Sequence, residues 1–342
     1  MADKVKMTEH FFMIMAAILI GLLAGFGAIG IRALIHEVSS LSYVGDGTLL
    51  ENIKAAPWYI KILIPALGGL IVGPIIYFFA PEAKGHGVPE VMQSLLLKGG
   101  VIRPRVAIIK AFASSITIGT GGSVGREGPI IQIGSSIGST VGQLFRVPTR
   151  RMKTLVGCGA AAGIAAAFNA PIAGALFAVE IILMDFKAEH FSPIVIASVM
   201  ATVVSHQFEG NLAAFAVPAY HLQSPYEIIF YFALGIITGL ISWLFIKVLY
   251  YSEDFWETKV KIPEWSKAAI GGVMIGVMAL IVPQIMGVGY ETITNALNGN
   301  FVWYMALLLV FVKIISTSIT LGSGGSGGIF APSLFMGALV GV

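Results

Sequence analysis

The stretch KAFASSITIGTGGSVGREGPIIQIGSSIG, residues 110–138, returns 203 residues later as KIISTSITLGSGGSGGIFAPSLFMGALVG, residues 313–341, and the two align without a gap. Apolar, glycine-rich composition raises the number of chance matches. It does not explain why Lys110 meets Lys313 and Pro129 meets Pro332 in one register. The other shared positions are Ser115-Ile116-Thr117, Gly119, Gly121-Gly122-Ser123, Gly125, Gly134 and Gly138. The chain therefore contains an internal duplication.

The order of predicted elements also repeats. In each half, two long apolar helices and a short amphipathic piece precede the duplicated motif. Duplicated halves with interrupted helices at matching places are typical of secondary transporters, with the substrate site where the interruptions meet. We expect one integral transport domain built from a first repeat, residues 1–210, and a second repeat, residues 224–342, which is incomplete at Val342.

Composition places this domain in a membrane. Hydrophobic residues make up 56% of the 342 positions and charged residues only 11%, whereas a soluble domain has about 25% charged residues. The net charge of +3 and the lack of a basic-aromatic array give no support for nucleic-acid binding. The single cysteine, Cys158, excludes an intrachain disulfide, and the histidines do not have the spacing of a metal site.

Apolar stretches predict an all-α polytopic fold with long helices and shorter, broken ones. A spanning helix needs about 20 apolar residues, and the run that begins at Phe11 is too long for a signal peptide. Leu41–Ala56 and Tyr251–Lys267 are predicted polar connections. The predicted long helices are Phe11–Ile35, Trp58–Ala80, Thr154–Phe168, Pro193–Val204, Tyr226–Tyr250, Ala268–Ile285 and Val302–Thr320. The predicted shorter pieces are Val88–Leu97, Val106–Ile118, Pro129–Phe145, Pro171–Met184 and Pro332–Val342.

Three segments share a design in which glycines and then a proline open a helix: Gly85–Pro89, Gly125–Pro129 and Gly328–Pro332. Proline suits the first helical turn, where the missing N–H has no partner to lose. The free N–H groups at such an end carry a partial positive charge of about half an electron. Ends of this kind can hold an anion weakly, and conduction requires weak binding.

These motifs resemble those of the CLC family of chloride channels and proton–chloride antiporters. Gly125-Arg126-Glu127-Gly128-Pro129 is similar to the family's GREGP signature, and Gly328–Pro332 is similar to its GxFxP motif. Gly85–Pro89 stands where the family has GSGIP. The run Ala160–Gly163, Phe168–Pro171, Ala173-Gly174, Phe177 and Glu180 also looks like the family. The resemblance covers essentially the whole chain.

The resemblance implies the site. Glu127 is the gate, because its carboxylate competes with anions at a helix end, and Arg126 acts mainly through its backbone. The implied anion-binding residues are Gly85, His86, Gly87, Gly125, Arg126, Gly128, Gly328, Ile329 and Phe330. The implied partners are chloride or another small anion, H⁺, the bilayer and a second copy in a homodimer formed through Pro171–Met184 and Pro193–Val204. No cofactor, metal, nucleic acid or enzymatic activity is expected, and the location is a cell membrane.

Two departures from the family leave alternatives open. His86 stands where the family usually has serine, so chloride preference is less secure than anion transport. Ile181 stands where proton-coupled members commonly carry an inner carboxylate, and isoleucine cannot relay a proton. The alternatives are a passive anion channel and a proton–anion exchanger, with Glu180 either a structural carboxylate with a local partner or, with Glu127, part of a proton path.

A rival from another class is an intramembrane serine hydrolase. Ser123 and Ser326 lie among glycines, as an exposed nucleophile can. Both belong to the repeat, however, and a nucleophile has no need of duplication, whereas a two-fold pore does. A nucleotide-binding loop at Gly119–Gly125 is excluded because no Gly-Lys-Ser/Thr follows.

Overall fold

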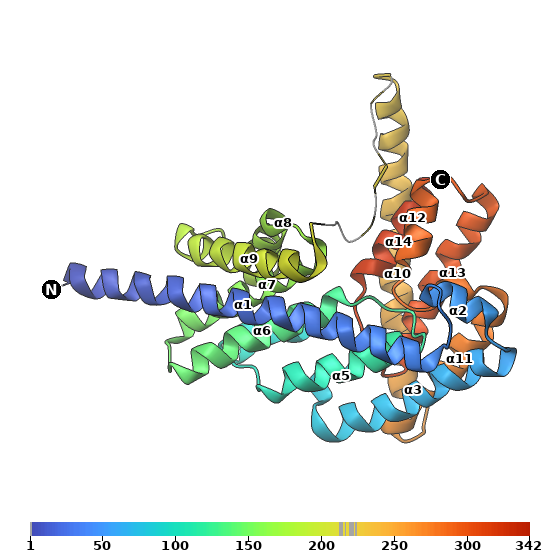
Figure 1. Ribbon diagram of the computed structural model, residues 1–342, viewed down its shortest axis with the longest axis horizontal. Coiled ribbons are helices and arrows are strands. Elements are labelled where there is room, and N and C mark those ends of the chain that lie inside the picture. Colours follow the sequence, from blue (N-terminus) through green and yellow to red (C-terminus); the bar gives the residue numbers. More distant parts are fainter. Residues whose placement is uncertain (1, 212–214, 216, 219–221, 223) are drawn as a thin grey trace. The chain divides into compact units, whose positions relative to one another are not determined.

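The computed structural model describes every residue except 1, 212–214, 216, 219–221 and 223, and the side chains of 2–8, 188 and 189 also lie outside the description. Within that part of the chain the structure is helical, with a single isolated β-bridge. The α-helices are α1 Ala2–Ser42, α2 Leu49–Ala55, α3 Trp58–Phe79, α4 Val88–Leu97, α5 Arg105–Gly119, α6 Glu127–Leu144, α7 Thr149–Phe168, α8 Pro171–Phe177, α9 Ala188–Glu209, α10 Glu227–Thr258, α11 Glu264–Ile281, α12 Tyr290–Leu297, α13 Trp303–Gly322 and α14 Phe330–Val340 (Figure 1). The short helices η1 Pro81–Ala83, η2 Ala178–Leu183 and η3 Pro283–Ile285 complete the set.

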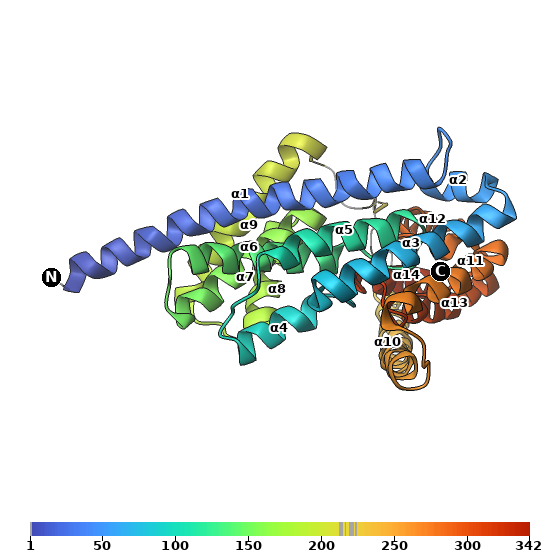
Figure 2. The same cartoon turned by 90° about the horizontal axis from the view of Figure 1, so that it is seen from below.

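Six helices of the described chain are long and apolar enough to cross a membrane: α1, α3, α9, α10, α11 and α13. The predicted polytopic all-α fold is confirmed, and the protein is a multi-pass membrane protein. The prediction was short at both ends of α1, which runs without a break from Ala2 to Ser42 (Figure 2). The predicted connection Leu41–Ala56 contains α2, whose Thr48 and Glu51 form a capping box.

The chain divides into two compact units. Unit 1 comprises residues 1–34, 80–115 and 127–214, and unit 2 comprises residues 35–79, 116–126 and 215–342. These units are a division by contacts, whereas the repeats 1–210 and 224–342 are a division by sequence, and the latter stays a prediction. The linker between the predicted repeats includes positions outside the described residues.

In unit 1, α6 packs against α7 through glycines. A Cβ on Gly134 would meet the carbonyl of Gly159, and a Cβ on Gly159 would meet the carbonyl of Gly134. Small residues let membrane helices approach closely, as the Gly159–Gly163 run predicts. The backbone of α6, which begins at Glu127, is thereby fixed against a neighbour.

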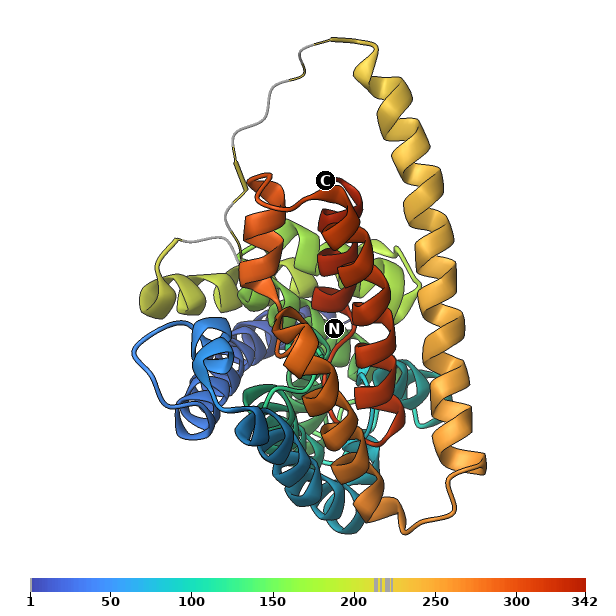
Figure 3. The same cartoon turned by 90° about the vertical axis from the view of Figure 1, so that its right-hand side faces the viewer.

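In unit 2, α3 and α11 also pack closely through glycines. A Cβ on Gly69 would meet the carbonyl of Ala268, and a Cβ on Gly272 would meet the carbonyl of Pro65. A buried apolar cluster holds η3, α12, α13 and α14 together around Phe335. Figure 3 shows α10 as one long helix, and it packs along α13 in the same unit.

The elements correspond in order across the duplication. The series α3, η1, α4, α5 and α6 in the first half matches α11, η3, α12, α13 and α14 in the second (Figure 1). The duplicated loops between α5 and α6 and between α13 and α14 both belong to a single compact unit, up to Arg126.

Candidate functional site

The two glycine-rich loops of the duplication are joined by a reciprocal pair of backbone hydrogen bonds. The Gly125 N–H donates to the Gly328 carbonyl at 2.7 Å, and the Gly328 N–H donates to the Gly125 carbonyl at 2.6 Å. A Cβ on Gly327 would collide with the side chain of Val124, so glycine is required for this approach. The loops that the sequence predicts to form the site are thus held together immediately before α6 and α14 begin.

Hydroxyl groups repeat this two-fold pattern one step away. The Ser123 N–H donates to Thr320 Oγ1 at 3.2 Å, and the Ser326 N–H donates to Thr117 Oγ1 at 3.3 Å. Thr117 and Thr320 are the same position in the two copies. The contacts therefore follow the internal symmetry, which explains why both serines and both threonines occur in register.

Glu127 is fully buried and is the first residue of α6. A carboxylate at this end of a helix interacts favourably with the partial positive charge of the first turn. Buried ionisable groups inside a membrane protein are costly and usually functional. This placement is compatible with the predicted gate, which stays a prediction.

The amino end of α14 differs from those of α4, α6 and α12. Ile329 is the N-cap, Phe330 is the first residue of the helix, and the first turn carries no acidic side chain. In contrast, the first turns of α4, α6 and α12 each hold a glutamate, namely Glu90, Glu127 and Glu291. Among these four ends, that of α14 is therefore the one without a carboxylate of its own to occupy its N–H groups.

The Arg126 side chain has a partner other than a free anion. Its guanidinium lies 5.2 Å from the centre of the Tyr290 ring, a cation–π contact within unit 2. This geometry fits the expectation that Arg126 contributes mainly through its backbone, which stays a prediction.

Gly85 and Gly87 both lie in the left-handed region, with φ of +72° and +86°, where residues with a Cβ are disfavoured. The buried Lys110 ammonium donates to the carbonyl of Ala83 at 3.0 Å and to that of Gly85 at 2.8 Å. The Lys110 ammonium of α5 therefore stabilises the turn before α4 by binding two of its carbonyl groups. Gly87 in turn faces the backbone of Gly128, so the starts of α4 and α6 lie together in unit 1.

The second half contains the same turn, which the sequence analysis missed. Gly287 and Gly289 have φ of +67° and +87°, and Lys313 donates to the carbonyls of Ile285 and Gly287 at 3.0 and 3.3 Å. The lysines are offset by 203 residues but the glycines by 202. An alignment without gaps does not detect this match. A search for the Gly-x-Gly pattern alone would have detected it.

The structure places the remaining candidates as follows. His86 is half-buried, and within the described residues its Nδ1 atom has no hydrogen-bond partner. Glu180 lies exposed on η2, and the local partner expected for it is not found in the part of the chain that the structure describes. Ile181 beside it is 40% exposed and apolar.

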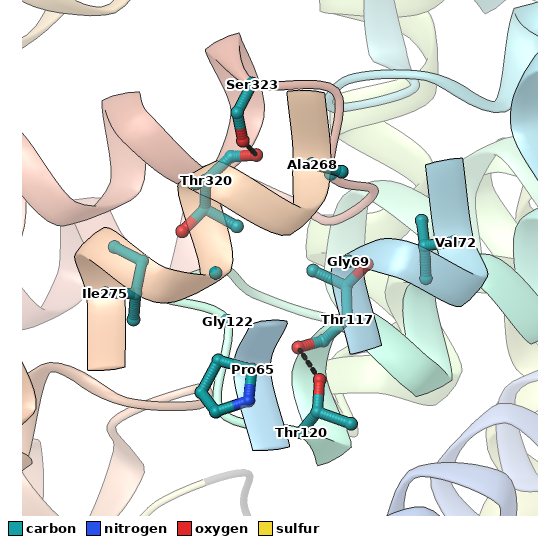
Figure 4. A pocket seen from close by; sticks show the side chains of 13 residues that line it. Pro65, Gly69, Val72, Thr117, Thr120, Gly122, Ala268, Ile275, Thr320 and Ser323 are labelled. Carbon is teal, nitrogen blue, oxygen red and sulfur yellow. Dashed lines mark hydrogen bonds between the residues drawn. The ribbon is translucent and has the colours of Figure 1, made fainter. Parts of the chain in front are cut away.

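A small cavity lies between α3, α5, α11 and α13 (Figure 4). It has a volume of about 20 Å³, which is room for about one water molecule. Thr117, Thr120, Thr320 and Ser323 line it, and none of the predicted anion-binding residues does. Its hydroxyl groups are occupied, since Thr120 donates to the Thr117 carbonyl and Ser323 to the Thr320 carbonyl.

The hydrolase alternative finds no support at Ser123. Its hydroxyl is fully buried and lies 2.9 Å from the hydroxyl of Ser316, a group that cannot act as a general base. The duplicated serines serve the contact between the loops.

Known proteins are similar to this chain in sequence. A 33% identical relative, the "H(+)/Cl(-) exchange transporter ClcA" of Vibrio parahaemolyticus, matches 98% of this chain and 72% of its own length. A 32% identical relative, "Chloride channel protein CLC-f" of Arabidopsis thaliana, matches 94% of this chain, which spans less than half, 43%, of that protein.

Solved structures agree with these matches. A structure titled "X-ray crystal structure of a slow cyanobacterial Cl-/H+ antiporter" is 26% identical, with a TM-score of 0.79, and the alignment covers 95% of this chain and 76% of that one. A CLC-type fluoride/proton antiporter at 22% identity shares the fold with a TM-score of 0.80, over 95% of this chain and 79% of its own. The sequence profile of the family described as "Voltage gated chloride channel" matches residues 68–342. This chain belongs to the voltage-gated chloride channel family.

Proposed function

We propose that this protein moves chloride, or a similar small anion, across the membrane along a path gated by Glu127. The observation that carries the proposal is the position of Glu127. It is a fully buried carboxylate on the first residue of α6, two residues after the Gly125–Gly328 bridge. The names of the exchanger and channel relatives, both of which refer to chloride, support the same substrate class.

The anion is held by backbone N–H groups in this proposal. Ile329 and Phe330 supply the central donors, because α14 has no acidic residue in its first turn to compete with the anion. Residues Arg126, Glu127 and Gly128 form the outer site, which the Glu127 carboxylate occupies when it is ionised and leaves when it is protonated or displaced. His86 and its flanking glycines, Gly85 and Gly87, contribute from the start of α4.

Glu127 gives the direct test. In liposomes, Glu127→Gln mimics the protonated gate and Glu127→Ala leaves the outer site open, so both variants are expected to retain anion flux and to lose its pH dependence. Chloride efflux measured between about pH 4 and pH 7 is the readout. Loss of flux in a folded Glu127→Ala protein would show that the side chain is needed for permeation and is not a gate.

Two coupling modes are distinguishable by recording protons together with anions. Exchange is supported by the buried gate carboxylate and by the antiporter relatives. A passive channel is favoured by Ile181, which cannot carry a proton. Uphill proton movement driven by a chloride gradient identifies an exchanger, and anion flux with no proton movement identifies a channel.

The proposed assembly is a homodimer with one path per subunit. Large apolar side chains on α8 and η2 are exposed, including Ile172 at 76% and Leu176 at 44%. A second copy would cover such a face. Native mass measurement in mild detergent that finds only monomers would contradict this assembly.

A further inference from the structure

The first-half copy of the Gly-x-Gly turn contains a group of polar side chains that its second-half copy lacks. Glu82, His86, Glu90 and Gln132 correspond by the offsets of 202 and 203 to Gln284, Val288, Thr292 and Phe335. Two carboxylates, an imidazole and an amide thus stand where the other half has an amide, a hydroxyl and two apolar side chains. Symmetry of the fold does not require this difference, so it calls for a function specific to unit 1.

Three of these side chains, Glu82, Glu90 and Gln132, line a cavity of about 270 Å³ in unit 1. That volume has room for several water molecules. The rim reaches the surface, because Val101 is 45% exposed and the Arg103 side chain is 46% exposed. Water therefore has access to the group from outside the unit.

Acceptor atoms in this group lack donors. Among the described residues, no hydrogen bond is found for the buried atoms Oε2 of Glu90, Oε2 of Glu82 and Oε1 of Gln132. Buried polar atoms are almost always paired with protein or water. Three acceptor atoms without a donor from the described residues therefore indicate that ordered water or a bound proton lies between these side chains.

Glu90 is the carboxylate of this group that is free to change its charge. Glu82 forms an ion pair with Arg103. Burial raises the pKa of the Glu82 carboxyl, but its backbone hydrogen bond and Arg103 outweigh burial and leave that pKa below its ordinary value. Among the described residues, no arginine is paired with Glu90 in this way. Its carboxylate accepts from the backbone N–H of Gly87 and faces the ammonium of Lys110.

The position of Glu90 connects the cavity to the candidate site. It lies in the first turn of α4, directly after Gly87, which packs against Gly128 and Gln132 of α6. Gln132 also joins α6 to η1, since its amide nitrogen donates to the Glu82 carbonyl at 2.7 Å. Glu90 is therefore connected through Gly87, at the start of α4, to Gly128, the residue that follows the proposed gate Glu127.

We propose that Glu90 is the proton-carrying carboxylate of this protein, loaded from the cavity lined by Glu82, Glu90 and Gln132, and that it takes the role for which Ile181 is unsuited. Hydronium in the cavity gives its proton to Glu90, which becomes a neutral acid, and the proton later returns to water on the side of the α4–α6 junction. The charged and titratable groups that face this step are Glu82, Lys98 and Arg103 of the cavity wall, His86 and Lys110. The inference rests on the proposed anion transport with Glu127 as gate.

The test compares Glu90→Gln with Glu291→Gln in the intact protein in liposomes, with chloride and proton fluxes recorded together. Glutamine keeps an oxygen for the Gly87 N–H but cannot release a proton. The ratio of protons to anions is expected to fall about a hundredfold in Glu90→Gln, which is the low end of what a positioned proton-transfer group contributes. Glu291 is the acid in the first turn of the matching helix α12, where it accepts from the Thr48 hydroxyl, and its variant is expected to keep the wild-type ratio.

A second variant covers the case in which Glu90→Gln does not fold. Val101→Trp fills the cavity from its exposed rim and is expected to slow proton movement more than anion movement. An unchanged ratio in either folded variant overturns the role of Glu90. Wild-type anion flux without protons also overturns it while leaving the Glu127 gate standing, and absence of wild-type anion flux overturns the proposed function itself.

Discussion

The Gly85–Gly87 turn in unit 1 is flanked by Glu82 and Glu90, which line a cavity, whereas the Gly287–Gly289 turn in unit 2 lies against the aromatic ring of Phe335. The backbone is the same in both, with matching left-handed glycines and a buried lysine that donates to two carbonyls. In unit 1 the lysine faces the Glu90 carboxylate, and in unit 2 it lies 5.0 Å from the centre of the Phe335 ring.

This difference separates the residues that build the backbone of the turn from the residues that set the polarity of the space beside it. The glycines and the lysine occur twice and build the start of a half-helix. The side chains that fill the space beside it occur once each. Gln132 and Phe335 stand at the same repeat position and are only 1% and 0% exposed, and they decide whether that space is polar or apolar.

Removing the two side chains at this repeat position gives the largest expected contrast. Phe335→Ala is expected to lower stability by about 3–5 kcal/mol, since it leaves a cavity in the apolar cluster of unit 2. Gln132→Ala, which removes one hydrogen bond to the Glu82 carbonyl, is expected to cost about 1 kcal/mol. Thermal unfolding in detergent is the measurement, and equal shifts for the two variants would mean that the two copies are packed alike.

Alanine at the second glycine of each turn sharpens the comparison at an intermediate scale. Both positions have φ near +86°, so the left-handed strain of about 1–2 kcal/mol is common to Gly87→Ala and Gly289→Ala. The new Cβ would meet the flexible end of Gln132 in one case and the rigid ring of Phe335 in the other, each at 2.8 Å.

Gly289→Ala is therefore expected to unfold at the lower temperature of the two. Gly87→Ala should show its effect mainly in transport, since the start of α4 adjoins Gly128. The reverse order of unfolding temperatures would indicate that Gln132 is held more firmly than its single hydrogen bond suggests.

The smallest expected effects come where the two halves are equivalent. Thr117→Val and Thr320→Val each remove the acceptor for one serine N–H of the opposite loop. Each variant is expected to cost about 1 kcal/mol, and the two costs should agree, because the bonds are reciprocal and of similar length. A difference of several kcal/mol between them would show that the loops are not energetically symmetric.

Much of this arrangement could be predicted from the sequence. The glycine–proline starts of α4, α6 and α14, the paired lysines and the approximate places of the long helices, but not their exact bounds, follow from composition, helix-start chemistry and the repeat. The predicted range Val88–Leu97 coincides with α4. The Thr48–Glu51 capping box of α2 was also readable from the sequence, but it lies in a stretch whose polarity suggested a connection.

The rest depends on contacts between distant parts of the chain. Nothing in local periodicity places the Gln132 amide beside Glu82, or leaves Glu90 facing a cavity, because those relations arise from the packing of α6 against η1 and α4. The match of residues 287–289 to 85–87 was hidden by a single-residue change in spacing before α13. A repeat search that permits one gap would have found it.

The reciprocal hydrogen bonds between Gly125 and Gly328 also have a consequence in time. The two residues are 203 positions apart, and ribosomes add roughly 5–20 residues per second, so Gly328 is made roughly 10–40 s after Gly125. Unpaired backbone groups in a lipid environment cost several kcal/mol each. During that interval the first loop has neither of these partners, and we expect nascent chains halted before Gly328 to expose it to proteases that the finished protein resists.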